Sequence, residues 1–156
     1  MNKFKKAYTL IEMLMVVAII GVLASSILIG LGSTRSKARD TRRLTDLKST
    51  QTALELYYSK YGVYPSRTPG TNETWEWTEL TDVLTSDETG LKLSKIPKDP
   101  LNNNEHKYMY ATDGQSYVLG VKLETKDQAL DDDLDGTILG MDCGDELGDE
   151  IYCISL

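Results

Sequence analysis

A long apolar run near the N-terminus limits what this chain can form more than any other feature does. It extends from Met13 to Leu31 and is interrupted only by Ser25 and Ser26. As an α-helix this run would extend roughly 28 Å, close to the roughly 30 Å hydrocarbon thickness of a bilayer, which predicts a membrane-spanning helix. A carboxylate, Glu12, stands at its start. A charge in a membrane helix costs roughly 2.5–3.5 kcal/mol at the centre and less near the edge, so Glu12 requires a functional partner.

A short basic leader precedes the run. It ends at Ala7 and is followed by YTLIE at residues 8–12. This layout resembles the N-terminus of type IV pilins and pseudopilins, although the family usually has Gly where Ala7 stands and Phe where Tyr8 stands. The resemblance implies that a prepilin peptidase cuts between Ala7 and Tyr8 and that the new amine of Tyr8 is methylated. It also implies a role in assembly for Glu12.

Two other interpretations of this N-terminus are a secretory signal peptide and a plain membrane anchor. A secretory signal has an apolar core of about 7–15 residues and a small-residue cleavage site after it. The run here is longer and begins next to Glu12, an acidic residue that such signals avoid. A plain anchor explains the length but not the TLIE sequence directly after the leader. The pattern therefore favours the prepilin interpretation.

Charge distribution predicts the topology. The basic leader places the N-terminus in the cytoplasm and everything after Leu31 outside, by the positive-inside rule. The basic stretch Arg35–Arg43 favours the opposite orientation, but two cysteines near the C-terminus suit an oxidising compartment and favour the first. The predicted location is a single-pass membrane protein with an extracytoplasmic globular domain, and a cell-surface or periplasmic filament after assembly. Net charge −7 argues against binding nucleic acid through a basic surface.

The two ends of the part after the apolar run are opposite in charge. Six basic residues lie between Arg35 and Lys48, against two acids. Eleven acids lie between Glu124 and Glu150, against the single Lys126. The two ends are therefore expected to present surfaces of opposite sign.

From Ser33 to Tyr61 the sequence is amphipathic with a helical period. Large side chains recur at spacings of three and four, namely Leu44, Leu47, Gln51, Leu54, Tyr58 and Tyr61. Gly62 is a helix stop and the first proline is Pro65, so residues 8–61 are predicted to form one helix. The stripe can pack on a sheet or form a coiled coil. Because it lasts only about two and a half heptads and ends in tyrosines, we expect the sheet.

The C-terminal part contains strand signals. Asp113-Gly114 separates two strand-like runs, residues 107–111 and 116–124, and this predicts a β-hairpin. Further short strands are expected at 137–139 and 151–154.

The predicted fold class is therefore α+β, with a long N-terminal helical spine that spans the membrane in its first half and a small antiparallel sheet packed on its outer half. The predicted domains are a cleaved leader (1–7), a transmembrane and assembly half of the helix (8–32) and an extracytoplasmic pilin-like globular domain (33–156). Between the helix and the hairpin we expect a long loop with one short helix, in which Trp75 and Trp77 pack inside, although they could form an adhesive surface.

Three short motifs extend the resemblance beyond the N-terminus. They are G-x-Y-P at residues 62–65, I-P-K-D-P at 96–100 and Y-V-L-G at 117–120. In this order they resemble the major pseudopilin of type II secretion and pilins of the same subgroup.

An acidic segment contains the sequence DDDLDG at residues 131–136. It matches D-x-D-x-D-G, the first half of a calcium loop, in which carboxylates at alternate positions face one centre and the glycine permits the turn. The predicted ligands to Ca²⁺ are Asp131, Asp133, Asp135, Thr137 through its carbonyl, and Asp142 at the twelfth position. The alternative is a solvated acidic loop. Major pseudopilins are similar in having a C-terminal calcium site.

The two cysteines, Cys143 and Cys153, lie in the last fourteen residues. A disulfide between them would close a short loop and contribute on the order of 2–3 kcal/mol, and it resembles the C-terminal disulfide loop of many pilins. Free thiols are the alternative. A zinc site is not expected, because the only histidine, His106, is distant in sequence and further ligands are lacking.

The predicted function is a structural subunit of a type IV pilus or pseudopilus, and not an enzyme. The resemblance implies as partners a prepilin peptidase and N-methyltransferase, other copies of the chain and minor pilins, an inner-membrane assembly platform and, before assembly, membrane lipid. In the filament we expect Glu12 to attract the amine of Tyr8 on a neighbouring subunit. The alternative function is a membrane-tethered extracellular calcium-binding module that does not polymerise.

Overall fold

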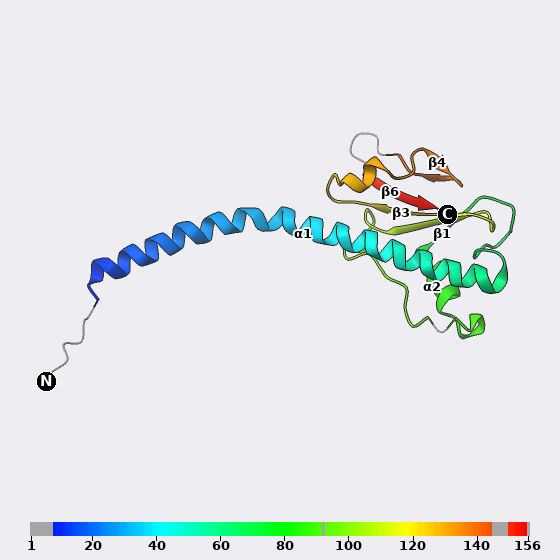
Figure 1. Ribbon diagram of the computed structural model, residues 1–156, viewed down its shortest axis with the longest axis horizontal. Coiled ribbons are helices and arrows are strands. Elements are labelled where there is room, and N and C mark those ends of the chain that lie inside the picture. The colour runs from blue at the N-terminus through cyan, green and yellow to red at the C-terminus, as the bar shows by residue number, and fades with distance from the viewer. Residues whose placement is uncertain (1–7, 92, 145–149, 156) are drawn as a thin grey trace. The chain divides into compact units, whose positions relative to one another are not determined.

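The computed structural model describes residues 8–91, 93–144 and 150–155, while the side chains of 26–31 lie outside that description (Figure 1). Helix α1, Leu10–Tyr61, confirms the predicted continuous helix. The chain divides into two units between Ser36 and Lys37, and α1 contributes to both.

In the first unit, α1 presents apolar side chains on all sides. Every described side chain from Tyr8 to Ser25 is exposed. Nowhere in the described ranges is a helix long and apolar enough to span a membrane. The expected membrane span of residues 8–32 is thus not supported by the structure, and six of its side chains fall outside the described ones.

In the second unit, α1 buries one stripe of side chains. Arg43, Leu47, Thr50 and Leu54 recur at helical spacing and have no exposed surface. The predicted stripe was correct in its centre but not at its end, because Tyr61 is 42% exposed. The helix stops there because the following Gly62 adopts φ +72°, and its N–H donates to the Tyr58 carbonyl at 2.7 Å.

The second unit contains a four-stranded antiparallel sheet. Its strands are β1 (Glu73–Trp75), β2 (Tyr108–Thr112), β3 (Tyr117–Lys122) and β6 (Ile151–Ser155), in the order β1-β2-β3-β6. The hairpin predicted at Asp113-Gly114 is confirmed between β2 and β3. Gly114 has φ +86°, which L-residues rarely adopt, and the Asp113 carboxylate accepts the N–H of Ser116 at 2.6 Å.

The two faces of the sheet are covered by different elements. One face joins α1 in the main core, to which Leu47 and Leu54 of the helix and Tyr110, Leu119 and Val121 of the sheet belong. The other face is covered by a small hairpin of β4 (Thr137–Ile138) and β5 (Met141–Asp142). This hairpin comes close because β3 has Gly120 there. A Cβ on Gly120 would lie 2.9 Å from the Met141 sulfur and 3.3 Å from the Cys153 sulfur.

Three short helical elements complete the second unit. Helix α2 spans Trp77–Thr85, and the 3-10 turns are η1 (Asp87–Thr89) and η2 (Gln128–Asp131). Trp77, the first residue of α2, is buried, and its Nε1–H donates to the Pro97 carbonyl at 2.7 Å. Trp75 is partly buried against the same core. Both tryptophans therefore pack inward, as predicted.

Candidate functional site

The start of α1 is organised by a contact between Thr9 and Glu12. The Glu12 Oε2 accepts the Thr9 N–H and the Thr9 hydroxyl, each at 2.7 Å. In return the Glu12 N–H donates to the Thr9 Oγ1 at 3.4 Å. This reciprocal arrangement is a capping box, which satisfies backbone N–H groups that have no partner inside the helix. Within one chain, therefore, the Glu12 carboxylate caps the N-terminus of α1.

The capping box was readable in the sequence, because T-x-x-E at residues 9–12 is its usual pattern. The role predicted for Glu12 from the sequence lies only between subunits. Tyr8 lies just before the helix and is 78% exposed. Ala7 lies outside the described residues. Cleavage after Ala7, methylation of Tyr8 and the pairing of Glu12 with a neighbouring amine stay predictions.

The first unit offers a continuous apolar surface. Its large apolar side chains from Tyr8 to Leu23 are each at least 50% exposed. Such a large exposed apolar surface marks a site of contact with another protein or with lipid. The N-terminal part of α1 thus has the properties of a binding surface.

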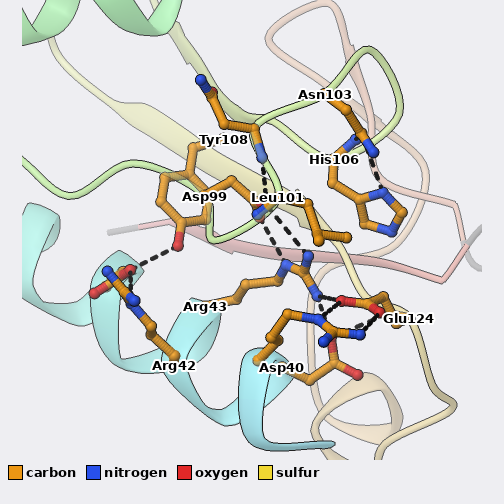
Figure 2. A network of polar contacts seen from close by, with 12 residues as sticks. Asp40, Arg42, Arg43, Asp99, Leu101, Asn103, His106, Tyr108 and Glu124 are labelled. Carbon is orange, nitrogen blue, oxygen red and sulfur yellow. Dashed lines mark hydrogen bonds and ion pairs between the residues drawn. The ribbon is translucent and has the colours of Figure 1, made fainter. Parts of the chain in front are cut away.

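The strongest electrostatic feature of the second unit is a buried cluster around Arg43 (Figure 2). The Arg43 side chain has no exposed surface, and neither do those of Asp40 and Asp99. Its guanidinium donates to Asp99 through two nitrogens, at 2.7 and 3.2 Å. It also donates to Asp40 at 2.7 Å and to Glu124 at 2.6 Å. Arg39 joins the cluster by pairing with Glu124.

The acids of this cluster also hold two loops against α1. The Asp40 carboxylate accepts the backbone N–H groups of Glu124 and Thr125, each at 3.0 Å. The Asp99 carboxylate accepts the N–H groups of Leu101 and Asn102, at 2.8 and 3.1 Å. The segment after β3 and the I-P-K-D-P loop are therefore tied to the same turn of helix. Asp99 is the acidic residue of that motif.

Charges within the cluster keep the carboxyl groups of Asp99 and Glu124 ionised. Hydrogen bonding to Arg39, reinforced by Arg43, lowers the pKa of Glu124 to about 2. Burial acts to raise the pKa of Asp99, but the Arg43 guanidinium and two backbone N–H groups outweigh it and lower that pKa. The carboxylates of the cluster compensate the charge of the buried Arg43 and accept its hydrogen bonds. The cluster therefore suits a structural role, in which it fastens loops to α1.

This cluster was not predicted from the sequence. The basic stretch Arg35–Arg43 was interpreted there only as charge that bears on topology and surface potential. The available signal was the spacing of Asp40 and Arg43, which puts an acid and a base on one face of a helix.

The predicted calcium ligands are separated by secondary structure. Thr137 and Asp142 face each other across β4 and β5, so the second half of the twelve-residue pattern forms a hairpin. The Asp133 carboxylate accepts the Cys153 N–H at 2.8 Å, and Asp142 accepts the Gly144 N–H at 3.1 Å. Among the residues described, no three His, Cys, Asp or Glu side chains are grouped to hold a metal ion. Calcium binding by these residues stays a prediction.

The predicted disulfide is confirmed. Cys143 and Cys153 are bonded, with a Cα–Cα distance of 5.7 Å, and both are fully buried. The bond links the chain just after β5 to the middle of β6. It thereby fastens the β4–β5 hairpin to the sheet that it covers.

Comparison with known families agrees with this architecture. A family model described as "Prokaryotic N-terminal methylation motif" matches residues 2–28. A second, described as "Type II secretion system (T2SS), protein G", matches residues 31–137, more than half of the chain.

Similar proteins are found among characterised sequences. The type II secretion system core protein G of Vibrio cholerae serotype O1 is 29% identical over 123 residues, which cover 78% of this chain and 82% of that protein. The core protein G of Escherichia coli K12 is 27% identical over 100 residues, covering 64% and 69%. The type IV major pilin protein PilE1 of Neisseria gonorrhoeae is 30% identical over 69 residues, covering 44% and 32%. No solved structure matches this chain.

Proposed function

Because the chain belongs to the type II secretion system protein G family, we propose that it is a structural subunit of a secretion pseudopilus. The observation that supports this most directly is the apolar surface of residues 8–25. Exposed in a single chain, this surface needs either lipid or other helices around it. A filament in which the N-terminal helices bundle gives every subunit such a partner.

The route to the filament begins with processing. In this proposal a prepilin peptidase removes residues 1–7 and methylates the amine of Tyr8. The methylation motif at residues 2–28 supports this step. The membrane holds the subunit through residues 8–32, with the second unit outside, until the assembly platform adds it to a filament of identical copies and minor subunits. The basic leader and the C-terminal disulfide support this orientation.

A pseudopilus is preferred to an adhesive pilus for two reasons. The protein G family model matches residues 31–137, which include most of the second unit. Similarity to the gonococcal pilin covers only 44% of the chain. The family is structural, and no catalytic role is proposed for this member.

Expression of the full chain with and without a prepilin peptidase tests the proposal. With the peptidase, mass spectrometry should find a chain that begins at a methylated Tyr8, and electron microscopy should find filaments when the assembly components are present. A chain that is cleaved but stays monomeric under those conditions would favour the tethered module instead. A chain that keeps its leader in the presence of the peptidase would contradict the proposal at its first step.

A further inference from the structure

A cleft of about 540 Å³ is lined by residues from the C-terminal end of α1, from α2 and from η1. Figure 1 shows α2 near this end of α1. Its walls include Tyr57 and Tyr61 of α1, and Asp82 and Glu88 on the opposite side. The two tyrosine rings are 4.5 Å apart, and both carboxylates are exposed. None of the ion pairs found within the described ranges involves Asp82 or Glu88. Aromatic faces beside acidic groups are the surroundings that bind a cationic side chain.

The chain's own Lys60 shows the same preference. Its ammonium lies 5.7 Å from the centre of the Tyr61 ring and donates to the Thr89 carbonyl at 2.6 Å. This contact holds η1 against the helix and leaves the carboxylates of Asp82 and Glu88 without a salt bridge to Lys60. The cleft thus retains negative charge for a cation from elsewhere.

Within the second unit, α1 covers residues 37–61, and exposed cations are found at the start of this segment. Lys37 is exposed and enters no ion pair within the part of the chain that the structure describes. Five residues later, the Arg42 side chain is 62% exposed and only loosely paired with Asp46, at 3.5 Å. The buried Arg43 and half-buried Arg39 are committed to the internal cluster. Lys37 and Arg42 are therefore two cations of this stretch that another molecule can reach.

We propose that the Tyr57–Tyr61 cleft of one subunit binds the Lys37 side chain of a second copy of this chain. Lys37 lies where α1 enters the second unit. The inference rests on the proposed function, because it assigns a contact within the filament. Head-to-tail contacts between two different surfaces generate open helical polymers when the rotation between copies does not close a ring, whereas a self-complementary surface closes a dimer. The two surfaces here are of opposite charge and lie at opposite ends of a helical segment that extends roughly 36 Å from Lys37 to Tyr61. Stacking one copy above another along the helix brings them together.

The acidic segment around Asp135 is the competing partner for the same cations. Asp131, Asp132 and Asp135 are exposed there. Residues 131–135 include no aromatic residue, so this segment offers charge without the aromatic ring faces of the cleft. We therefore assign Lys37 to the cleft and use Asp135 as the alternative in the test.

Charge-reversal variants of the full chain, assembled in cells and measured as filament recovered after shearing, test this contact. Glu88→Lys and Lys37→Glu should each reduce filament recovery about tenfold, because like charges then face each other. The double variant should recover most of it. Asp135→Lys, which changes net charge equally, should assemble as the native chain does.

Each outcome decides the assignment. Native-like assembly of Glu88→Lys, or failure of the double variant to exceed the single ones while each remains folded and cleaved, would overturn it. Rescue of Lys37→Glu by Asp135→Lys would assign the cations to the acidic segment instead. Failure of the native chain to form filaments would remove the proposed function itself, and this result is distinct from all of the others. A cysteine pair, Lys37→Cys with Ser86→Cys, should give crosslinked ladders in native filaments only if the cleft is the partner.

Discussion

The two halves of α1 differ in where they find their partners. From Leu10 to Leu23 the apolar side chains are exposed, and the second unit buries Arg43, Leu47 and Leu54 of the same helix completely. One half depends on other molecules, whereas the other is held by long-range contacts within the chain. A single helix can thus present an exposed apolar surface at one end and form part of a domain's core at the other. Changes in the two halves should therefore affect different measurements.

Glu12 offers the sharpest test of the N-terminal half, and the largest expected effect. Glu12→Ala removes both the capping box and the charge, and we expect it to abolish filaments while the second unit stays folded. Glu12→Gln keeps an N3 side chain that can complete a capping box but removes the charge. If the carboxylate pairs with a neighbouring Tyr8 amine, both variants should fail in a shearing assay.

Thr9→Ala is the matched control for the cap, with an expected cost of about 0.5–2 kcal/mol in helix stability and little loss of filaments. Normal assembly of Glu12→Gln beside failure of Glu12→Ala would assign Glu12 to capping and contradict the pairing.

Arg43 is the corresponding residue of the second half. Arg43→Met leaves Asp40, Asp99 and Glu124 buried without their cation, and we expect the free energy of unfolding to fall by about 3–5 kcal/mol. Urea denaturation of the detergent-solubilised chain measures it. Arg42 is the preceding residue and its side chain is exposed, so Arg42→Met should change the free energy of unfolding by less than about 1 kcal/mol. Equal effects of the two substitutions would show that the buried cluster contributes no more than a surface pair.

The disulfide should stabilise the second unit to a smaller degree. Replacing both cysteines by serine should lower the free energy of unfolding by about 2–3 kcal/mol, because the unfolded chain regains the freedom of a short loop. The reduced native chain should unfold at the same denaturant concentration as the double variant. If reduction has no effect on the midpoint, the bond contributes little and the packing around Gly120 is sufficient.

Calcium should have the smallest effect. A weak extracellular site with a dissociation constant of about 0.1–1 mM would raise stability by roughly 0.4–1.4 kcal/mol at about 1 mM Ca²⁺. Thermal unfolding with Ca²⁺, with Mg²⁺ and with a chelator measures this shift, and Asp135→Asn should remove it. Identical midpoints in calcium and chelator would leave the segment as a solvated acidic loop.

Local signals in the sequence predicted much of the fold. The helical period to Tyr61 with Gly62 after it, and Asp113-Gly114 between two strand-like runs, each specify structure within a few residues. The Arg43 cluster could not be found in this way. Its partners Asp99 and Glu124 lie 56 and 81 residues away, and nothing in the local pattern relates them.

In the acidic segment, two local patterns overlap, namely the calcium-loop pattern and a hairpin turn. The calcium pattern requires residues 131–142 to curl around one centre. Leu139 and Gly140 instead adopt φ +52° and +84°, which forms a tight turn and pairs β4 with β5. Residues 137–142 thus belong both to the twelve-residue ligand pattern and to a β-hairpin, and calcium binding stays a prediction.

The contact between Asp133 and β6 bears on edge-to-edge aggregation between subunits. β6 is the last strand of the sheet, and the backbone N–H and C=O of Cys153 are taken by Asp133 and Leu134. Unpaired strand edges invite edge-to-edge aggregation, and an inward-pointing carboxylate blocks it. A protein made to polymerise must restrict growth to one kind of contact. By occupying the middle of this strand, Asp133 and Leu134 hinder sheet-to-sheet growth at the β6 edge.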